Sequence, residues 1–250
     1  PGVEFKNVSL TYSGSGAPSV EGINFKAMKG QTIGVIGGTG SGKSSLVNLI
    51  PRLYDATQGE VLVDGVNVKD YDIEALRNKV GIVMQKAVLF KGTIRENMWM
   101  GKKGATDEQI DEALEISQSK EFVDSKQGRL DYVIEQGGKN LSGGQRQRLT
   151  IARAIVRKPD VLILDDSASA LDFATDAALR KAIRGMNNSP TVFIVSQRAA
   201  SLMYADLIIV LDDGQVAGMG THDELLANCE VYKEIYESQF KKADSEGGVA

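Results

Sequence analysis

Apolar and polar residues alternate at the start of the chain, where Val3, Phe5, Val8 and Leu10 are separated mainly by polar positions. A period of two predicts a strand, and the glycine-rich segment 13–18 predicts a turn after it. Further strands are predicted at residues 23–27, 32–36, 61–63 and 80–84, the third of them leading through an Asp64-Gly65 hairpin turn to Val66. The chain is therefore expected to begin with a β-rich part.

The middle of the chain changes to a helical pattern. Between Ile94 and Gln127 the apolar residues recur at helical spacing. One face of the expected helices carries Ile110, Ala113, Leu114 and Ser117. This stretch is expected to form an inserted α-helical subdomain.

The last part of the chain returns to strands that alternate with helices. A helix from about Gly143 to Arg157 is expected to stop before Pro159, because proline cannot continue a helix. Strands are predicted at residues 161–164, 191–195 and 207–211. The expected fold class is α/β: a mixed, β-rich N-terminal part and a parallel sheet flanked by helices, with the helical subdomain inserted.

Composition excludes some classes of function. The 250 residues carry a net charge of −4 with a pI of about 5.2, which argues against nucleic acid as the main partner. The single Cys229 cannot form an intrachain disulfide, so we expect a buried thiol and a cytosolic protein. No apolar run approaches the roughly 18 residues of a membrane-spanning helix, and the N-terminus has no signal-peptide pattern. If the protein works at a membrane, another segment or chain is expected to span it.

A complete phosphate-binding loop joins a predicted strand to a helix that begins near Lys43. Its residues are Gly37, Gly38, Thr39, Gly40, Ser41, Gly42, Lys43 and Ser44, and we group Ser45 with them. Such glycines let backbone N–H groups point at phosphate oxygens. Lys43 is expected to reach the β- and γ-phosphates, and the Ser44 hydroxyl to bind magnesium. The strand-loop-helix context favours a P-loop NTPase core with ATP and Mg²⁺ as cofactors over a glycine-rich structural turn.

An aliphatic run, residues 161–164, ends in two aspartates. Asp165 fits as a further magnesium partner, direct or through water. Alone, such an aspartate would more often be a surface turn residue, so this assignment depends on the phosphate loop.

The segment Leu141-Ser142-Gly143-Gly144-Gln145 resembles the signature motif of the ATP-binding cassette (ABC) family, and the resemblance extends over the chain through Phe240. It implies a head-to-tail dimer in which one domain's signature faces the ATP on the other's phosphate loop. Ser142 can hydrogen-bond the γ-phosphate, while Gly143 and Gly144 open a helix N-terminus to it. A simple N-cap is the alternative. Two glycines at a helix start disfavour it, because they cost stability unless close backbone approach is needed.

The resemblance also implies roles for single positions. Tyr12 matches the aromatic that stacks on adenine, although a tyrosine at a strand end is commonly core packing. Gln85 matches the glutamine that contacts magnesium and senses the transport domains. The segment Ser169-Ala170-Leu171-Asp172 matches the loop that links the two ATP sites. We expect a nucleotide-binding core over residues 1–87 and 159–240, a helical subdomain over 88–158 and a flexible tail over 241–250.

Two segments resemble exporter-type features and favour an exporter over an importer. They are residues 89–97, Leu89 to Asn97, and Glu135-Gln136-Gly137-Gly138 before the signature. The resemblance then implies two kinds of partner at the cytoplasmic face of a membrane: a second ABC nucleotide-binding domain, and the transmembrane domains of an exporter.

Two departures from the family pattern refine this reading. Asp166 stands where the family usually has a catalytic glutamate, and Gln197 where it usually has a histidine. Aspartate and glutamate have similar pKa values of about 3.9 and 4.3, so reach rather than basicity separates them. A glutamine can donate to phosphate but cannot become cationic. The only histidine, His222, is expected to cap a helix.

These departures, beside an intact signature, resemble the degenerate-site half of a heterodimeric multidrug-type exporter. Its own site would bind ATP and hydrolyse it slowly, while its signature would serve a non-identical partner. One alternative is a homodimeric exporter domain with engineered catalytic substitutions, and another is a non-hydrolytic, nucleotide-gated regulatory module. A chromosome-maintenance ATPase is disfavoured, because no long heptad arm lies between Lys43 and Leu141.

Overall fold

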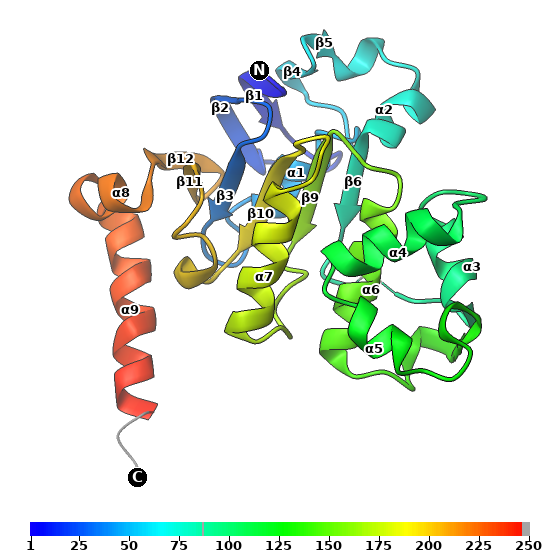
Figure 1. The fold of residues 1–250 in the computed structure, drawn as a ribbon. Coiled ribbons are helices and arrows are strands. Elements are labelled where there is room, and N and C mark those ends of the chain that lie inside the picture. The colour runs from blue at the N-terminus through cyan, green and yellow to red at the C-terminus, as the bar shows by residue number, and fades with distance from the viewer. Residues whose placement is uncertain (87, 247–250) are drawn as a thin grey trace. The chain divides into compact units, whose positions relative to one another are not determined.

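The computed structural model describes residues 1–86 and 88–246 (Figure 1). The chain divides into two compact units, a first unit of residues 1–77 and 191–250 and a second unit of residues 78–190. The boundary falls inside helix α2 (Ile73–Lys79) and directly before strand β10. The domain boundaries expected from the sequence were placed by the motifs and differ from the boundaries of these two units. They stay a prediction.

An antiparallel sheet in the order β2-β1-β4-β5 forms one layer of the first unit. Its strands are β1 (Val3–Leu10), β2 (Val20–Ala27), β4 (Gln58–Val63) and β5 (Val66–Asn67). Asp64 and Gly65 have positive φ values of 50° and 78°, as a two-residue type I′ hairpin requires. Val3, Phe5 and Val8 are buried, and the Phe5 ring stacks on Phe25 at 4.5 Å. The predicted β-rich start and its hairpin are thus confirmed.

The same unit contains the strand order β12-β11-β3-β10. These strands are β3 (Thr32–Ile36), β10 (Thr191–Ser196), β11 (Leu207–Asp212) and β12 (Gln215–Gly220). β3 runs parallel to β10 and β11, and Ile36 pairs with Ser196 on one side and Val210 on the other. The carboxyl ends of all three strands therefore lie at one edge, where loops bind ligands in open α/β sheets.

Helices complete the first unit: α1 (Lys43–Asn48), η1 (Val68–Asp70), η4 (Ala199–Ser201), α8 (His222–Asn228) and α9 (Glu230–Glu246). α1 begins at Lys43 as predicted but ends at Asn48, and Leu49 and Ile50 are buried beyond it. Cys229 is buried, as expected.

His222 does not cap α8, so that expectation is wrong. Thr221 is the N-cap, and it forms a capping box with Glu224. A threonine hydroxyl can accept the orphan backbone N–H at this position, which explains the preference. His222 is the first helical residue instead, and its Nδ1 lies 2.6 Å from the Tyr232 hydroxyl.

α9 extends further than the sequence indicates. It continues to Glu246, through residues 241–246 of the expected flexible tail. Lysine, alanine and glutamate have high helix propensity, and no glycine or proline interrupts this stretch, so the helix can propagate. Residues 247–250 lie outside the described residues. Within the described residues, no helix is both long enough and apolar enough to cross a membrane.

The second unit combines a parallel strand pair with helices. β6 (Val80–Val83) lies parallel to β9 (Val161–Asp165), and helices α6 (Gly143–Ile155) and α7 (Phe173–Arg184) belong to the same unit. The predicted helical stretch is resolved into α3 (Ile94–Trp99), α4 (Asp107–Ile116) and α5 (Lys120–Asp124). Ile110, Ala113, Leu114 and Ser117 are buried, which confirms their shared face.

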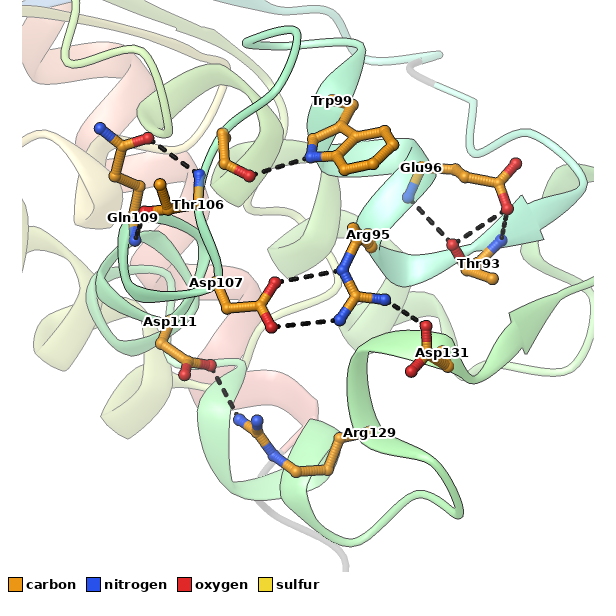
Figure 2. A network of polar contacts seen from close by, with 11 residues as sticks. Thr93, Arg95, Glu96, Trp99, Thr106, Asp107, Gln109, Asp111, Arg129 and Asp131 are labelled. Atoms are coloured by element: carbon orange, nitrogen blue, oxygen red, sulfur yellow. Dashed lines mark hydrogen bonds and ion pairs between the residues drawn. The ribbon is translucent and has the colours of Figure 1, made fainter.

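Two arginines join the short helices of this unit (Figure 2). Arg95 in α3 pairs with Asp107 at the start of α4 and with Asp131 in η2 (Arg129–Asp131). Arg129 pairs with Asp111 in α4 and Asp124 in α5. These helices have six, ten and five residues, too short to be stable alone in water. Contacts between them, of which this network is one part, therefore stabilise the subdomain.

Candidate nucleotide-binding site

The phosphate loop lies between the end of β3 and the start of α1 in the first unit. A Cβ atom at Gly37 would come within 2.5 Å of the Leu211 carbonyl oxygen, so no larger residue fits there without a shift. Gly42 has a φ of 102°, and a Cβ at that position would lie 2.6 Å from the Ser19 carbonyl oxygen. Glycine at both positions is a requirement of the loop's shape.

The inside of this loop fits a phosphate group. Lys43 Nζ donates to the carbonyl oxygens of Gly37 at 2.7 Å and Gly38 at 2.8 Å, which holds the cation at the loop. Among the described residues, the buried Ser41 Oγ has no hydrogen-bond partner. A pocket of about 440 Å³ opens beside residues 40–45, with Asp213 on its lining. A buried hydroxyl without a partner and a nearby ammonium group suit an anionic ligand.

Gln197 lies directly after β10, at the same edge as the phosphate loop. Its Nε2 is 3.4 Å from Thr39 Oγ1, so the structure brings these two predicted residues together. The loop around it is held by a residue that the sequence reading missed. Gln239 in α9 donates from Nε2 to the Gln197 carbonyl oxygen at 2.6 Å, and its Oε1 accepts from the Ala199 N–H at 2.8 Å.

Tyr12 also lies beside the phosphate loop. Its hydroxyl is 2.8 Å from Ser45 Oγ, and its half-buried ring meets Tyr54 edge-to-face at 4.9 Å. Tyr54 is 48% exposed and was not singled out from the sequence. The predicted stacking of Tyr12 on adenine stays a prediction, with Tyr54 as a second aromatic at that position.

The second unit carries its own group of predicted residues. β6 and β9 are parallel, and Val83 pairs with Leu164. Asp165 ends β9, and Asp166 and Gln85 follow the two strands at the same edge. Gln85 is exposed and both aspartates are half-buried. Asp166 has a φ of 49°, in the left-handed region that aspartate visits more readily than most residues. Ser44, which is also predicted to bind magnesium, belongs to the first unit.

The signature segment begins helix α6, and Ser142 is the N-cap of that helix. Its Oγ accepts from the Gln145 N–H at 3.2 Å, and Gln145 Oε1 accepts from the Ser142 N–H at 3.0 Å. This capping box satisfies two orphan donors of the helix start. A hydroxyl that accepts one bond still carries a hydrogen, so capping leaves Ser142 a donor for a phosphate oxygen.

The same helix start contacts the loop Ser169-Ala170-Leu171-Asp172. A Cβ at Gly144 would lie 3.3 Å from the Ala170 carbonyl oxygen, a tight approach that glycine permits. Gln147, another residue missed from the sequence, joins the two segments. Its Nε2 donates to Ser169 Oγ at 3.1 Å, and its Oε1 accepts from the Ala170 N–H at 2.9 Å.

Asp172 ends this loop as the N-cap of α7. Its Oδ1 accepts from the Thr175 N–H at 2.7 Å. That hydrogen bond to the backbone of Thr175 is the main reason why the pKa of the Asp172 carboxyl is lowered. The carboxylate is therefore fixed in its ionised form at the start of α7.

The two exporter-type segments lie side by side. Strand β7 (Gly92–Thr93) pairs with β8 (Val133–Ile134), and the Gly137 N–H donates to the Leu89 carbonyl oxygen at 3.1 Å. Asn97, which is 2% exposed, donates to the carbonyl oxygens of Phe90 and Thr93. One buried amide thus shapes the first of these segments.

Comparisons with known proteins agree with this geometry. A family model described as "ABC transporter" matches residues 20–169. YfiB of Bacillus subtilis, an uncharacterized ABC transporter ATP-binding protein, is 43% identical over 98% of this chain and 42% of its own length. A putative multidrug export ATP-binding/permease protein of Staphylococcus aureus is 38% identical over 95% of this chain and 41% of its own length.

A solved structure agrees as well. The structure of a bacterial Atm1-family ABC exporter with ATP bound matches 95% of this chain and 42% of its own chain, with a TM-score of 0.89 and 32% identity. This chain therefore spans about two fifths of the length of the relatives it matches.

Proposed function

Because the chain belongs to the ABC transporter family and is an ABC-type ATPase domain, we propose that it drives a multidrug-type exporter from the cytoplasmic face of a membrane. In this proposal the chain is one half of a heterodimer. Its own site holds Mg-ATP and turns it over slowly, and its signature serves the site of a non-identical partner.

Gln197 is the observation that carries the slow-site proposal. Its side chain reaches the phosphate loop, with Nε2 at 3.4 Å from Thr39 Oγ1. An amide can donate to a phosphate oxygen there, but it cannot supply the positive charge of a histidine. Asp166 adds to this, because its carboxylate is one methylene shorter than that of glutamate. A misplacement of roughly 1 Å can cost about a hundredfold in rate.

Different residues of the chain would bind the phosphates and the metal of Mg-ATP. Mg-ATP, when bound, supplies the phosphoanhydride and a metal charge that offsets its phosphates. Lys43 and the N–H groups of the phosphate loop would bind the phosphates, and Ser44, Gln85 and Asp165 would hold the metal. Asp166 would orient the attacking water from a position slightly too far away.

An intact signature supports a partner domain. Ser142 keeps a donor hydrogen, and Gly143 and Gly144 leave the start of α6 accessible to an anion. In a head-to-tail dimer these groups would contact the nucleotide on the other domain's phosphate loop. A partner with glutamate and histidine at the two altered positions would supply the hydrolytic activity that this chain's own site lacks.

An apolar surface in the second unit supports the transmembrane partner. Met84, Val88, Phe90 and Met100 are 43–57% exposed. A cavity of about 220 Å³ lies between Phe90, Met100 and two arginines of α6 and its end, Arg153 and Arg157. Exposed apolar patches of this kind mark interaction sites. We assign this surface to the cytoplasmic segments of the transmembrane domains.

The proposal is tested by titrating the chain with Mg-ATP in a calorimeter and by measuring phosphate release. We expect clear ATP binding, very slow release and a largely monomeric chain. Lys43→Ala is the control, because it removes the cation from the loop and should abolish the heat of binding. Brisk turnover by the chain alone would refute the slow site and favour the homodimeric alternative, whereas no turnover in the assembled transporter would favour a regulatory module.

A further inference from the structure

One side chain of α9 forms two hydrogen bonds with the backbone of the loop that contains Gln197. The amide of Gln239 bonds the Gln197 carbonyl oxygen through Nε2 and the Ala199 N–H through Oε1, at 2.6 Å and 2.8 Å. A carbonyl only accepts and an N–H only donates, so these partners fix the orientation of the amide. The backbone is thus held on both sides of Arg198. We call residues 197–199 the switch loop.

The position of Gln239 is set by the packing of α9. Tyr232, Ile235, Tyr236 and Gln239 follow at spacings of three and four residues, which places them on one helix face. Tyr232 is fully buried in a cluster that includes Ile36, Ile208 and Leu225, and Ile235 and Tyr236 pack against it. Apolar contacts therefore fix α9 one turn before Gln239.

Other hydrogen bonds also restrain the switch loop. The Arg198 N–H donates to Ser196 Oγ at 3.0 Å, the Ser201 N–H donates to the Arg198 carbonyl oxygen at 3.2 Å, and the Leu202 N–H donates to the Ala199 carbonyl oxygen at 3.0 Å. The partners in these bonds all lie within residues 196–202. Gln239 adds two hydrogen bonds from a separate element, α9, to the backbone on both sides of Arg198, where the side chain of residue 197 turns toward Thr39.

We propose that Gln239 is a positioning residue for ATP turnover, which fixes the backbone of the switch loop so that the side chain at position 197 lies against the phosphate loop. The inference rests on the proposed role of Gln197 at the γ-phosphate. Gln239 forms both hydrogen bonds with backbone atoms, so these bonds do not depend on which side chain stands at position 197. They would hold a histidine there as well as a glutamine.

The test compares three variants of Gln239 and its neighbour in the full-length transporter. Gln239→Leu removes both hydrogen bonds and keeps an apolar side chain that extends as far as Cδ. Gln239→Glu keeps the acceptor for the Ala199 N–H and loses the donor. Ser238→Ala is the matched control, because Ser238 is exposed and its hydroxyl bonds only within α9, to the Ile235 carbonyl oxygen.

Two measurements report on different parts of the inference. Amide hydrogen exchange should speed up about tenfold or more at Ala199 in Gln239→Leu, but not in Gln239→Glu, because only the former loses that acceptor. The single-turnover rate at this chain's own site should fall about tenfold in both, with ATP affinity at that site changed less than about twofold, since phosphate binding by Lys43 is untouched. Ser238→Ala should match the parent protein in both measurements.

A double variant of residues 197 and 239 distinguishes a positioning role of Gln239 from a purely structural one. If Gln239 acts through Gln197, the double variant Gln197→Ala with Gln239→Leu should be no slower than Gln197→Ala alone. Fully additive losses, or an unchanged single-turnover rate in Gln239→Leu, would overturn the inference. If Gln197→Ala itself leaves turnover unchanged, the proposed role of Gln197 fails first, and the inference falls with it.

Discussion

The backbone conformation at Asp166 favours aspartate over glutamate. Its φ of 49° is in the left-handed region, where aspartate is several-fold enriched over most residues. A glutamate would lack the short polar side chain that can stabilise this conformation locally. The aspartate thus suits the local backbone, while its short side chain limits its reach toward a phosphate.

Repairing both altered positions should restore turnover at this site. Asp166→Glu with Gln197→His is expected to raise the single-turnover rate in the assembled transporter by up to about a hundredfold, more than either change alone. In the proposed mechanism both groups act on one water and one phosphate, so the gains should be non-additive. Asp166→Asn is the control, since it suits the same backbone without a charge and should abolish turnover. Strictly additive gains would contradict a shared geometry.

Residue chemistry was predictable where it depends on neighbours in sequence, as at Lys43, where α1 begins directly after the glycine loop. Gln197 was instead singled out by resemblance to a family position, and its contact with Thr39 spans 158 residues of sequence. Gln239 and Gln147 were not predictable, because their partners are 42 and more than 20 residues away. A glutamine on a helix gives no sign from sequence of which distant backbone it will bond.

Among the elements, the short helices of the second unit depend on acidic side chains that bond arginines. The hydrogen bond from Arg95 lowers the pKa of Asp107, and those from Lys120 and Arg129 lower the pKa of Asp124. A carboxyl whose pKa is lower in the folded state stabilises that state above its unfolded pKa. This contribution is lost as the pH falls through the lower folded value.

The second unit should therefore lose stability below about pH 4, where these aspartates take up protons. Arg95→Gln should flatten this loss, because Asp107 then titrates as in the unfolded chain. Urea unfolding followed between pH 7 and pH 3 measures it. The control is Lys26→Gln, which removes an exposed lysine that pairs with Glu4 in the first unit and should leave the loss in the second unit unchanged. Parallel profiles for the parent and Arg95→Gln would contradict the expected role of the network.

Strands and helices with a strong period were predictable, and weakly patterned ones were not. β1 and β3 have the predicted bounds. β12 was missed, because Gly218 and Gly220 interrupt its apolar pattern and its strand is half-exposed at the sheet edge. The extent of α9 was underestimated for the opposite reason, since helix propensity continues after the apolar period ends.

For the whole molecule, the two ATP-related motifs of the chain are expected to serve different nucleotides. Ser142→Asp should abolish most ATPase activity of the heterodimer, because it keeps the helix cap but places a negative charge against the partner's phosphate. Nucleotide binding at Lys43 should persist. Lys43→Ala should do the reverse, emptying this chain's site while part of the turnover survives. Steady-state hydrolysis and labelled-ATP occupancy measure both.

Ser142→Thr is the control for this pair, since it keeps both the cap and the hydroxyl and should retain most activity. Equal and complete loss of hydrolysis from Ser142→Asp and Lys43→Ala would indicate two equivalent, obligatorily coupled sites. The weak-site assignment would then have to be abandoned. The family and fold were predictable for the whole molecule because the motifs are specific in type and spacing, whereas the partner's identity depends on residues that lie in another chain.

The contact between Gln147 and the loop at Ser169 and Ala170 limits how the signature can be exchanged. Gln147 lies in the helix that the signature begins, and its amide bonds the loop, so a graft of this helix that replaces position 147 would meet a loop that does not match it. The transplanted unit has to include position 147 and residues 169–172. Over evolutionary time the same linkage predicts paired substitutions at these positions, even though more than 20 residues separate them in sequence.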